Sequence, residues 1–404
     1  MLEKLAKGLE IAVRSGAAPV MFGARLATRF AEREGSSRAS PRGDWSLATK
    51  VVLDEVFYTA ELAAAPFVSL AETPRVVREF GRTLAFFRRR GWLEDPTSYH
   101  REPPVLEVAS IDEIRAPRLP YRHLRYASGY APHRNEPGRA RWLAHTANRT
   151  AHAWLLKHPG PMRPWLVCIP GYRMGHPWID FTAFRVHWLH RTLGFNIAIP
   201  VLPLHGPRRI GRRGGDGFFT GDFVDTLHAQ TQAVWDTRRL LAWLRSHGAP
   251  ALGVYGISLG GYTAALLAAL DADLACVVAG IPAADFSRLL QSHTPAIVLR
   301  AAARVGYSFE EIAKVLRVVS PLTMTPRVPK ERRFLYAGLA DGVTTPDHAR
   351  DLWLHWEKPR AVWYRGSHVS FLWEPRVREL LSEAFVSSGL VSPPAERPTA
   401  SRGH

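Results

Sequence analysis

Short apolar segments alternate with amphipathic segments over most of the chain, and this alternation limits the folds available to it. The apolar segments predict strands at 165–170, 196–202, 252–255, 274–281, 334–337 and 361–364. The segments between and after them predict helices at 181–192, 222–246, 259–270, 346–356 and 369–385. Apolar strands joined by helices are typical of a mostly parallel sheet that helices cover on both faces. We therefore predict an α/β fold.

The flanking segments predict how the 404 residues are divided. We expect an N-terminal helical extension over 1–105 and the α/β domain over 106–390. Residues 391–404 are rich in Pro, Ser and Arg and predict a disordered tail.

Two features of the domain fall outside the simple alternation. Segments 121–126 and 141–145 predict two strands joined by a turn that contains Gly, Pro and Asn. Segment 286–333 predicts a mainly helical, lid-like insertion. Its apolar side chains could either cover an acyl-binding site or pack on the core.

One motif that carries chemistry follows the predicted strand at 252–255. It is the pentapeptide Gly256-Ile257-Ser258-Leu259-Gly260, and a helix rich in Ala and Leu comes after it. A serine on a sharp strand-to-helix turn needs neighbours without side chains, because other backbone passes close by. Amides after the serine then lie at a helix N-terminus, where partial positive charge stabilises an oxyanion. We predict Ser258 as a nucleophile; the alternative is a glycine-rich turn that begins an ordinary helix.

A serine nucleophile needs a base that takes its proton and an acid that orients the base. His368 follows the strand at 361–364 in a glycine-containing loop, and we predict it as the base. His348 and His355 fall inside a predicted helix, and we expect them at the surface.

Two carboxylates compete for the role of the acid. Asp341 follows the strand at 334–337, whereas Asp285 follows the strand at 274–281. We prefer Asp341, because a carboxylate at a strand's C-terminal end, before a new helix, suits that role. Ser258, Asp341 and His368 would then lie beyond the carboxyl ends of parallel strands, where open α/β sheets gather their sites.

The order Ser, Asp, His resembles that of the α/β-hydrolase superfamily, over about residues 121 to 385. Segments 170–172 (Pro-Gly-Tyr), 203–209 (Pro-Leu-His-Gly-Pro-Arg-Arg) and 256–261 (Gly-Ile-Ser-Leu-Gly-Gly) are similar to a narrower branch, which includes the abhydrolase-domain-18 type of eukaryotic proteins. The resemblance implies hydrolysis of acyl esters, with phospholipids among the candidate substrates. It implies no metal and no organic cofactor.

The loop after the first strand of the alternation is expected to complete an oxyanion hole. It contains Gly171 and Tyr172, where lipases and esterases of the superfamily carry a His-Gly loop. Pro170 stands in place of the family histidine, so only a backbone donor is carried over. We predict the N–H groups of Tyr172 and Leu259 as the two donors.

A basic loop follows the strand at 196–202 and carries Arg208, Arg209, Arg212 and Arg213. Guanidinium groups match phosphates and carboxylates in shape and charge, so these arginines predict contact with an anionic substrate or an anionic membrane surface. The alternative is a solvated basic loop with no ligand.

Composition and net charge indicate which classes of binding partner to expect. The formal net charge is +17, which favours anionic partners. No RNA-recognition signature, zinc finger or helix-turn-helix is evident, so we expect no nucleic acid. Cys168 and Cys276 lie in apolar runs and are expected as buried thiols, neither a disulfide nor metal ligands. No apolar run is long enough to span a bilayer and the N-terminus does not read as a secretory signal, so we expect a cytoplasmic protein, with peripheral membrane contact as an option.

These observations lead to a hypothesis about function. The main hypothesis is that the protein is a hydrolase that cleaves a carboxylic ester of a small molecule or lipid through an acyl-serine intermediate. An acyltransferase would use the same triad but pass the acyl group to an alcohol. A non-catalytic binding protein of the same fold is the alternative from another class.

Overall fold

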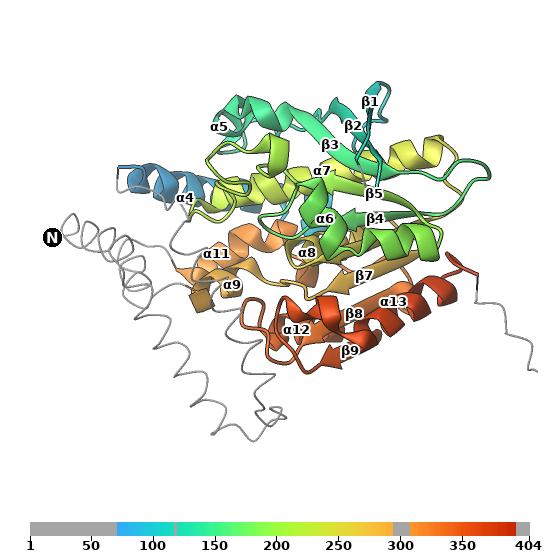
Figure 1. Cartoon of the computed structure of the whole chain (residues 1–404). Helices are drawn as coiled ribbons and strands as arrows, with labels where there is room; N and C mark the ends of the chain where they lie inside the picture. Colours follow the sequence, from blue (N-terminus) through green and yellow to red (C-terminus); the bar gives the residue numbers. More distant parts are fainter. Residues whose placement is uncertain (1–70, 117–118, 294–307, 393–404) are drawn as a thin grey trace, which may run out of the picture.

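A mixed sheet of nine strands organises the part of the chain that the computed structural model describes, residues 71–116, 119–293 and 308–392. Six neighbouring strands of this sheet are parallel, and three antiparallel strands extend it at one edge (Figure 1). In sheet order the strands are β1 (Ala109–Ile114), β2 (Tyr121–Ala127), β3 (Thr150–Leu156), β5 (Asn196–Val201), β4 (Trp165–Ile169), β6 (Leu252–Ile257), β7 (Cys276–Gly280), β8 (Arg333–Gly338) and β9 (Arg360–Tyr364).

Helices cover both faces of the sheet, because successive strand side chains point to opposite faces and both faces are apolar. In β6, Val254 belongs to one buried cluster and Tyr255 to the other. The helices that cover the first face are α7 (Phe223–Ser246), α8 (Leu259–Leu270) and α12 (Pro346–His355). Those that cover the second face are α6 (Pro177–Ala183), the short π-helix η3 (Trp188–Thr192) and α13 (Pro375–Ser387). The predicted α/β fold with a mostly parallel sheet is confirmed.

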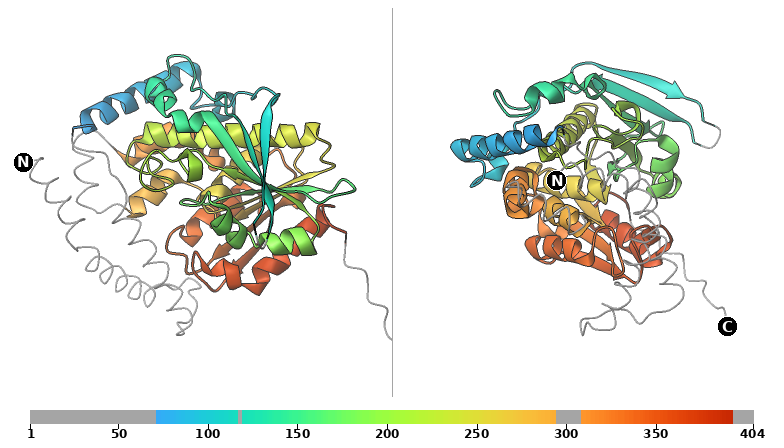
Figure 2. Two further views of the ribbon diagram at one scale, coloured as in Figure 1. Left: turned by 45° about the horizontal axis from the view of Figure 1, so that its top comes forward. Right: turned by 90° about the vertical axis from the view of Figure 1, so that its left-hand side faces the viewer.

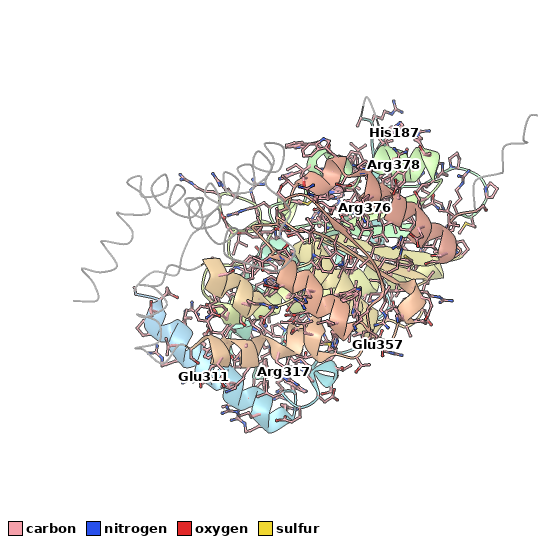
Figure 3. All side chains as sticks on the ribbon, turned by 90° about the horizontal axis from the view of Figure 1, so that it is seen from below. His187, Glu311, Arg317, Glu357, Arg376 and Arg378 are labelled. Atoms are coloured by element: carbon pink, nitrogen blue, oxygen red, sulfur yellow. The ribbon has the colours of Figure 1, made fainter. Side chains whose placement is uncertain are left out.

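Two of the segments that cover the second face, α13 and η3, contact each other. Arg378 of α13 lies over the ring of Trp188 in η3, with 5.2 Å between the guanidinium carbon and the ring centroid. Figure 3 shows His187, just before η3, close to Arg376 and Arg378. The loops that precede α6 and α13 follow the parallel strands β4 and β9, so both loops begin at the carboxyl edge of the sheet.

The described part of the N-terminal extension packs on the α/β core. Helix α4 (Thr73–Arg90) lies beside α7 (Figure 2), and its buried Phe80 and Phe87 belong to the same apolar cluster as α7. An ion-pair network strengthens this contact, since Arg75 bonds Asp222 at the start of α7 at 2.9 Å. Residues 1–70 of the predicted extension, and 393–404 of the predicted tail, lie outside the described residues.

The insertion 286–333 is mainly helical over its described residues. It contains α9 (Phe286–His293), α11 (Phe309–Leu316) and three 3₁₀ turns, η5 (Arg317–Val319), η6 (Pro321–Thr323) and η7 (Lys330–Arg332). Val315 is fully buried in the core cluster, and Arg317 donates a hydrogen bond to the carbonyl of Leu93 after α4, where Figure 3 labels it. These parts pack on the core. A lid role stays a prediction, and residues 294–307 lie outside the described residues.

Near the antiparallel edge, one predicted strand is wrong and two strands are missing from the prediction. Segment 141–145, predicted as a strand, belongs to helix α5 (Arg139–Ala144), in which the buried Trp142 donates its indole N–H to Gln232 of α7 at 2.8 Å. Strand β2 pairs with β1 on one side and with β3 on the other, and the sequence patterns predict neither of these two strands. Strand β1 was also missed, since its residues are largely exposed and carry no apolar alternation.

Two predicted helices are shorter than their apolar patterns suggested. The helix predicted at 369–385 divides into a 3₁₀ turn, η8 (Ser370–Trp373), and α13, which begins at Pro375 because proline suits the first turn and restricts the residue before it. The helix predicted at 181–192 divides into α6 and η3, with Arg185 at a left-handed φ of 48° between them.

Arg208 is part of the fold rather than of the exposed basic loop. It is fully buried, and its guanidinium pairs with Asp236 of α7 at 2.8 Å and donates to the carbonyls of Val201 and Asn148. Asp236 in turn accepts a hydrogen bond from Ser128. This placement differs from the expectation that all four arginines face a ligand. Arg208 instead ties the end of β5 to α7.

Removing Arg208 should therefore destabilise the fold. Arg208→Met leaves the buried Asp236 without its cation, and we expect the free energy of unfolding to fall by roughly 3–5 kcal/mol. Urea unfolding monitored by circular dichroism measures the loss. The double variant Arg208→Met/Asp236→Leu buries no uncompensated charge and should lose less than the single variant; an equal or larger loss would contradict this role.

Candidate active site

Ser258 lies on the turn that joins β6 to α8. Its backbone has φ 56° and ψ −116°, a conformation that side-chain-bearing residues rarely adopt. Its N–H donates to the carbonyl of Gly280 at the end of β7, at 2.9 Å. The side chain is half-buried at the carboxyl edge of the sheet. The strained turn thus presents the hydroxyl at this edge instead of burying it in the sheet.

Glycines on both sides of Ser258 are required by close backbone approach. A Cβ atom on Gly256 would lie 2.0 Å from the carbonyl oxygen of Gly260. A Cβ atom on Gly260 would lie 1.9 Å from the carbonyl oxygen of Ile169 in β4. Either contact is far inside van der Waals distance, so the Gly-x-Ser-x-Gly pattern has a direct steric cause.

Asp341 and His368 meet beyond the ends of β8 and β9. His368 Nδ1 and Asp341 Oδ2 are 2.8 Å apart, and both side chains are buried. Asp341 Oδ1 accepts hydrogen bonds from the N–H groups of Val343 and Thr344, each at 2.9 Å, and Oδ2 accepts one from the Thr344 hydroxyl at 3.0 Å. These donors hold the carboxylate in place for the imidazole.

This contact determines which ring nitrogen of His368 can act as a base. A carboxylate only accepts hydrogen bonds, so Nδ1 carries the proton in the neutral ring and Nε2 carries the lone pair. Nε2 is on the side of the ring away from Asp341. The loop of His368 follows β9 and that of Ser258 follows β6, so both lie at the same edge of one parallel sheet.

Asp285, the competing candidate for the acid, has a structural role instead. Its Oδ1 accepts hydrogen bonds from the N–H and hydroxyl of Ser287, both at 2.8 Å, and from the N–H of Arg288 at 3.1 Å. This is the geometry of a side chain that caps the first turn of a helix, here α9. The structure brings Asp341, and not Asp285, to His368.

His348 is buried, so its expected surface position is wrong. Its Nδ1 accepts weak hydrogen bonds from the N–H groups of Ala284 and Asp285, both at 3.3 Å. Burial lowers the pKa of His348 to about 4, so the ring is neutral at pH 7. The sequence held a signal for this, because His348, Leu352 and Trp356 recur every four residues and form the buried stripe of α12.

The loop after β4 lies directly beside the serine. A Cβ atom on Gly171 would lie 3.4 Å from the Cβ of Ser258. Tyr172, the next residue, is half-buried, and its ring packs against those of His205 and Phe219. The amide of Leu259 belongs to the first turn of α8, where N–H groups have no carbonyl partner within the helix. One predicted donor therefore belongs to the loop beside Ser258, and the other directly follows Ser258.

Asp180, a residue that the sequence did not single out, anchors this loop. Its carboxylate is buried and accepts hydrogen bonds from the N–H of Gly175 at 2.9 Å and from the indole of Trp154 at 3.0 Å. Burial raises the pKa of Asp180 to about 7, although both donors oppose the shift. Its only signal in the sequence was its place just before a predicted helix.

The basic loop between β5 and α7 is hydrogen-bonded to the loop that follows β4. Arg173 donates to Asp216 at 2.6 Å and to the carbonyl of Gly214 at 2.8 Å. Asp216 also accepts a hydrogen bond from the N–H of Arg213 at 2.9 Å. Of the four arginines predicted to meet a ligand, the three that are exposed are Arg209, Arg212 and Arg213.

Neither a metal-binding cluster nor a membrane-spanning helix occurs among the described residues. Within 71–116, 119–293 and 308–392, no three His, Cys, Asp or Glu side chains gather in a way that could hold a metal ion. The helices of this part of the chain are all too short or too polar to cross a membrane. Cys168 and Cys276 are free, fully buried thiols, as predicted.

The sheet, its helices and the serine turn define an α/β-hydrolase fold, and solved structures agree. The acetyl xylan esterase from Paenibacillus sp. R4 matches with a TM-score of 0.51 and 16% identity, over 72% of this chain and 99% of that chain. Acetyl Xylan Esterase 1 from Thermoanaerobacterium sp. JW/SL YS485 matches with a TM-score of 0.51 and 16% identity, over 74% and 93%. Likeness at this level of identity shows a shared fold.

Relatives in sequence identify the family. The proteins named Uncharacterized protein MT2702 and Uncharacterized protein Rv2627c, both from Mycobacterium tuberculosis, are 40% identical to this chain over 351 residues, which is 86% of the chain and 84% of each relative. The chain belongs to the family of these mycobacterial proteins. No family model matches it. The narrower resemblance to the abhydrolase-domain-18 type stays a prediction.

The raised pKa of Asp180 has a testable consequence for stability. Between pH 3.8, its usual pKa, and about 7, the folded protein keeps a proton that the unfolded chain releases. The free energy of unfolding should therefore fall as pH rises through this window, by up to about 1.4 kcal/mol per pH unit from this group, and level off above it.

Comparison with Asp180→Asn isolates this effect. The variant lacks the titrating carboxyl group, and the contributions of all other titrating groups cancel in the difference between the two free energies of unfolding. Urea unfolding of both proteins across this pH range measures it. The stability of wild type relative to the variant should decrease from acidic to neutral pH. A constant difference would show that the pKa of Asp180 is not raised.

Proposed function

We propose that this protein is a serine hydrolase that cleaves a carboxylic ester through an acyl-serine intermediate. The observation that carries the proposal is the buried 2.8 Å contact between His368 and Asp341, at the edge of the sheet where the strained turn presents Ser258. A base oriented by a carboxylate, next to a serine, is the arrangement that activates a hydroxyl.

In the acylation step, Ser258 Oγ attacks the acyl carbon of the ester and His368 Nε2 takes the hydroxyl proton. Asp341 stabilises the imidazolium that forms and holds its orientation. The N–H groups of Tyr172 and Leu259 donate to the tetrahedral oxyanion. The bond between the acyl carbon and the alcohol oxygen then breaks, and His368 gives its proton to that oxygen.

In the deacylation step, water replaces the alcohol. His368 Nε2 takes a proton from water as its oxygen attacks the acyl carbon of the acyl-serine. Collapse of the second oxyanion breaks the bond to Ser258 Oγ, which regains a proton from His368. The products are a carboxylic acid and the free enzyme, and no cofactor enters either step.

The exposed arginines of the basic loop indicate which class of substrate the site would favour. Arg209, Arg212 and Arg213 lie on a loop that Arg173 attaches to the loop beside Ser258. Their charge favours an ester of a lipid or another molecule with a phosphate or carboxylate near the scissile bond. We propose an anionic acyl ester, with phospholipids as the leading candidates, as the substrate class.

The role of Ser258 can be tested with a fluorophosphonate probe, which reacts covalently with activated serines. Ser258→Ala should abolish both labelling and ester turnover, because it removes the attacking oxygen. Its melting temperature should change little, since one hydroxyl at the surface of the turn is lost. Ser246→Ala, at the far end of α7, serves as the matched control and should label like wild type. Labelling that persists in Ser258→Ala would refute the assignment.

The two carboxylates give a second test of the triad. Asp341→Asn and His368→Ala should each lower turnover of a soluble ester by about 10⁴-fold, because Ser258 then keeps its proton. Asp285→Asn keeps a side-chain oxygen that can cap α9, because asparagine caps helices about as well as aspartate, and it should keep most of the activity. Steady-state kinetics of the three variants decide between the acids. A larger loss of kcat in Asp285→Asn than in Asp341→Asn would mean that the acid is misassigned.

A further inference from the structure

Two tryptophans are strongly exposed close to the candidate active site. Trp178 is 74% exposed and Trp373 is 69% exposed, although tryptophan is usually among the more buried residues. Trp178 is in the first turn of α6, after β4, and Trp373 ends η8, after β9 and His368. Both therefore follow the carboxyl ends of parallel strands, as Ser258 does.

The basic loop adds an apolar side chain and three cations to this edge. Ile210 is 42% exposed and lies between Arg209 and Arg212. No ion pair within the described part of the chain engages the guanidinium of Arg209, Arg212 or Arg213. We call the six residues Trp178, Arg209, Ile210, Arg212, Arg213 and Trp373 the mouth surface.

The order of the strands places the mouth surface on both sides of Ser258. β5 and β9 are five strand positions apart, with β6 between them. At about 4.8 Å per strand, these positions span roughly 24 Å. The basic loop and Trp178 lie on the β5 and β4 side of the serine, and Trp373 lies on the β9 side. Apolar and basic groups thus flank the candidate catalytic serine.

Acidic groups at this edge do little to balance the arginines. Asp180 and Asp216 are on the same loops, but both are buried and bonded to Gly175 and Arg173. Asp347, at the start of α12, is exposed. Glu374, next to Trp373, is half-buried and accepts a hydrogen bond from the N–H of Arg376. The basic loop is therefore the part of the mouth surface that is cationic where it meets solvent.

We propose that the mouth surface docks on an anionic phospholipid bilayer and so brings Ser258 to its lipid substrate. The indole rings of Trp178 and Trp373 suit the headgroup region, where tryptophan is favoured. The arginines are attracted to anionic headgroups, each strengthening binding about fivefold. A second copy of the chain is a poorer occupant, because a symmetric contact would bring the same arginines together. The choice of lipid as the ester rests on the proposed function, whereas docking itself does not.

Vesicle flotation of the full-length Ser258→Ala protein tests docking without turnover. The vesicles contain phosphatidylcholine alone, or phosphatidylcholine mixed with phosphatidylglycerol. We expect binding to the mixed vesicles and much weaker binding to phosphatidylcholine. Arg209→Gln/Arg212→Gln/Arg213→Gln should weaken binding to the mixed vesicles on the order of 100-fold at low salt. Trp178→Ala/Trp373→Ala should weaken it at least tenfold, because two interfacial rings are lost.

Matched controls remove similar groups elsewhere. Arg88→Gln/Arg89→Gln/Arg90→Gln removes three exposed charges at the end of α4, about 22 Å along that helix from Arg75. Met162→Ala removes an exposed apolar side chain before β4, at the opposite edge of the sheet. Both controls should bind like the parent protein. Equal loss from the controls, or parental binding by either mouth-surface variant, would overturn the proposal.

The outcomes separate this inference from the proposed function. If wild type is not labelled by the fluorophosphonate probe, the hydrolase proposal fails while the vesicle result stands by itself. If labelling succeeds but the mouth-surface variants bind vesicles normally, the hydrolase proposal stands and docking fails. Turnover of a soluble, neutral short-chain ester by Trp178→Ala/Trp373→Ala should match wild type, which shows that the variant is folded.

Discussion

The close approach of α8 to β4 at Gly260 determines most of the candidate site. The carbonyl of Ile169 leaves no room for a side chain at Gly260, and the helix that carries this glycine starts directly after Ser258, which has a positive φ. Gly171, two residues after β4, lies beside the serine, since a Cβ atom added to it would be 3.4 Å from the Cβ of Ser258. The strand order, with β4 next to β6, thus places the proposed nucleophile beside the loop that carries a proposed oxyanion donor.

Loops around the serine are held by buried polar groups rather than left to move. Asp180 anchors the loop after β4, and the Arg173–Asp216 pair ties that loop to the basic loop. Such anchoring is what a preorganised oxyanion site needs, because donors already in place cost no rearrangement when charge develops. The same anchoring holds the basic loop, with its exposed arginines, beside the loop that follows β4. The proposed chemistry and the proposed docking therefore depend on one rigid edge of the sheet.

The sequence predicted those features that local patterns encode. Apolar strands and the glycine-flanked Ser258 were found because burial and close approach leave direct marks on residue type. The contacts of Arg208, Asp180 and His348 were not found, because each depends on partners far along the chain, such as Asp236, Trp154 and Ala284. Charge alone marked Arg208 as a surface group, yet the fold supplies a buried carboxylate for it. Strand β1 was missed since its exposed faces carry no apolar signal.

The central claim is that an acyl group becomes attached to Ser258 during turnover. Protein quenched in acid while it hydrolyses a slowly turned-over carboxylic ester can be examined by intact mass spectrometry and peptide mapping. We expect a mass increase equal to the acyl group, located on the peptide that contains Ser258. An adduct on a different residue, or steady ester turnover without any adduct under conditions in which deacylation is slow, would contradict the account.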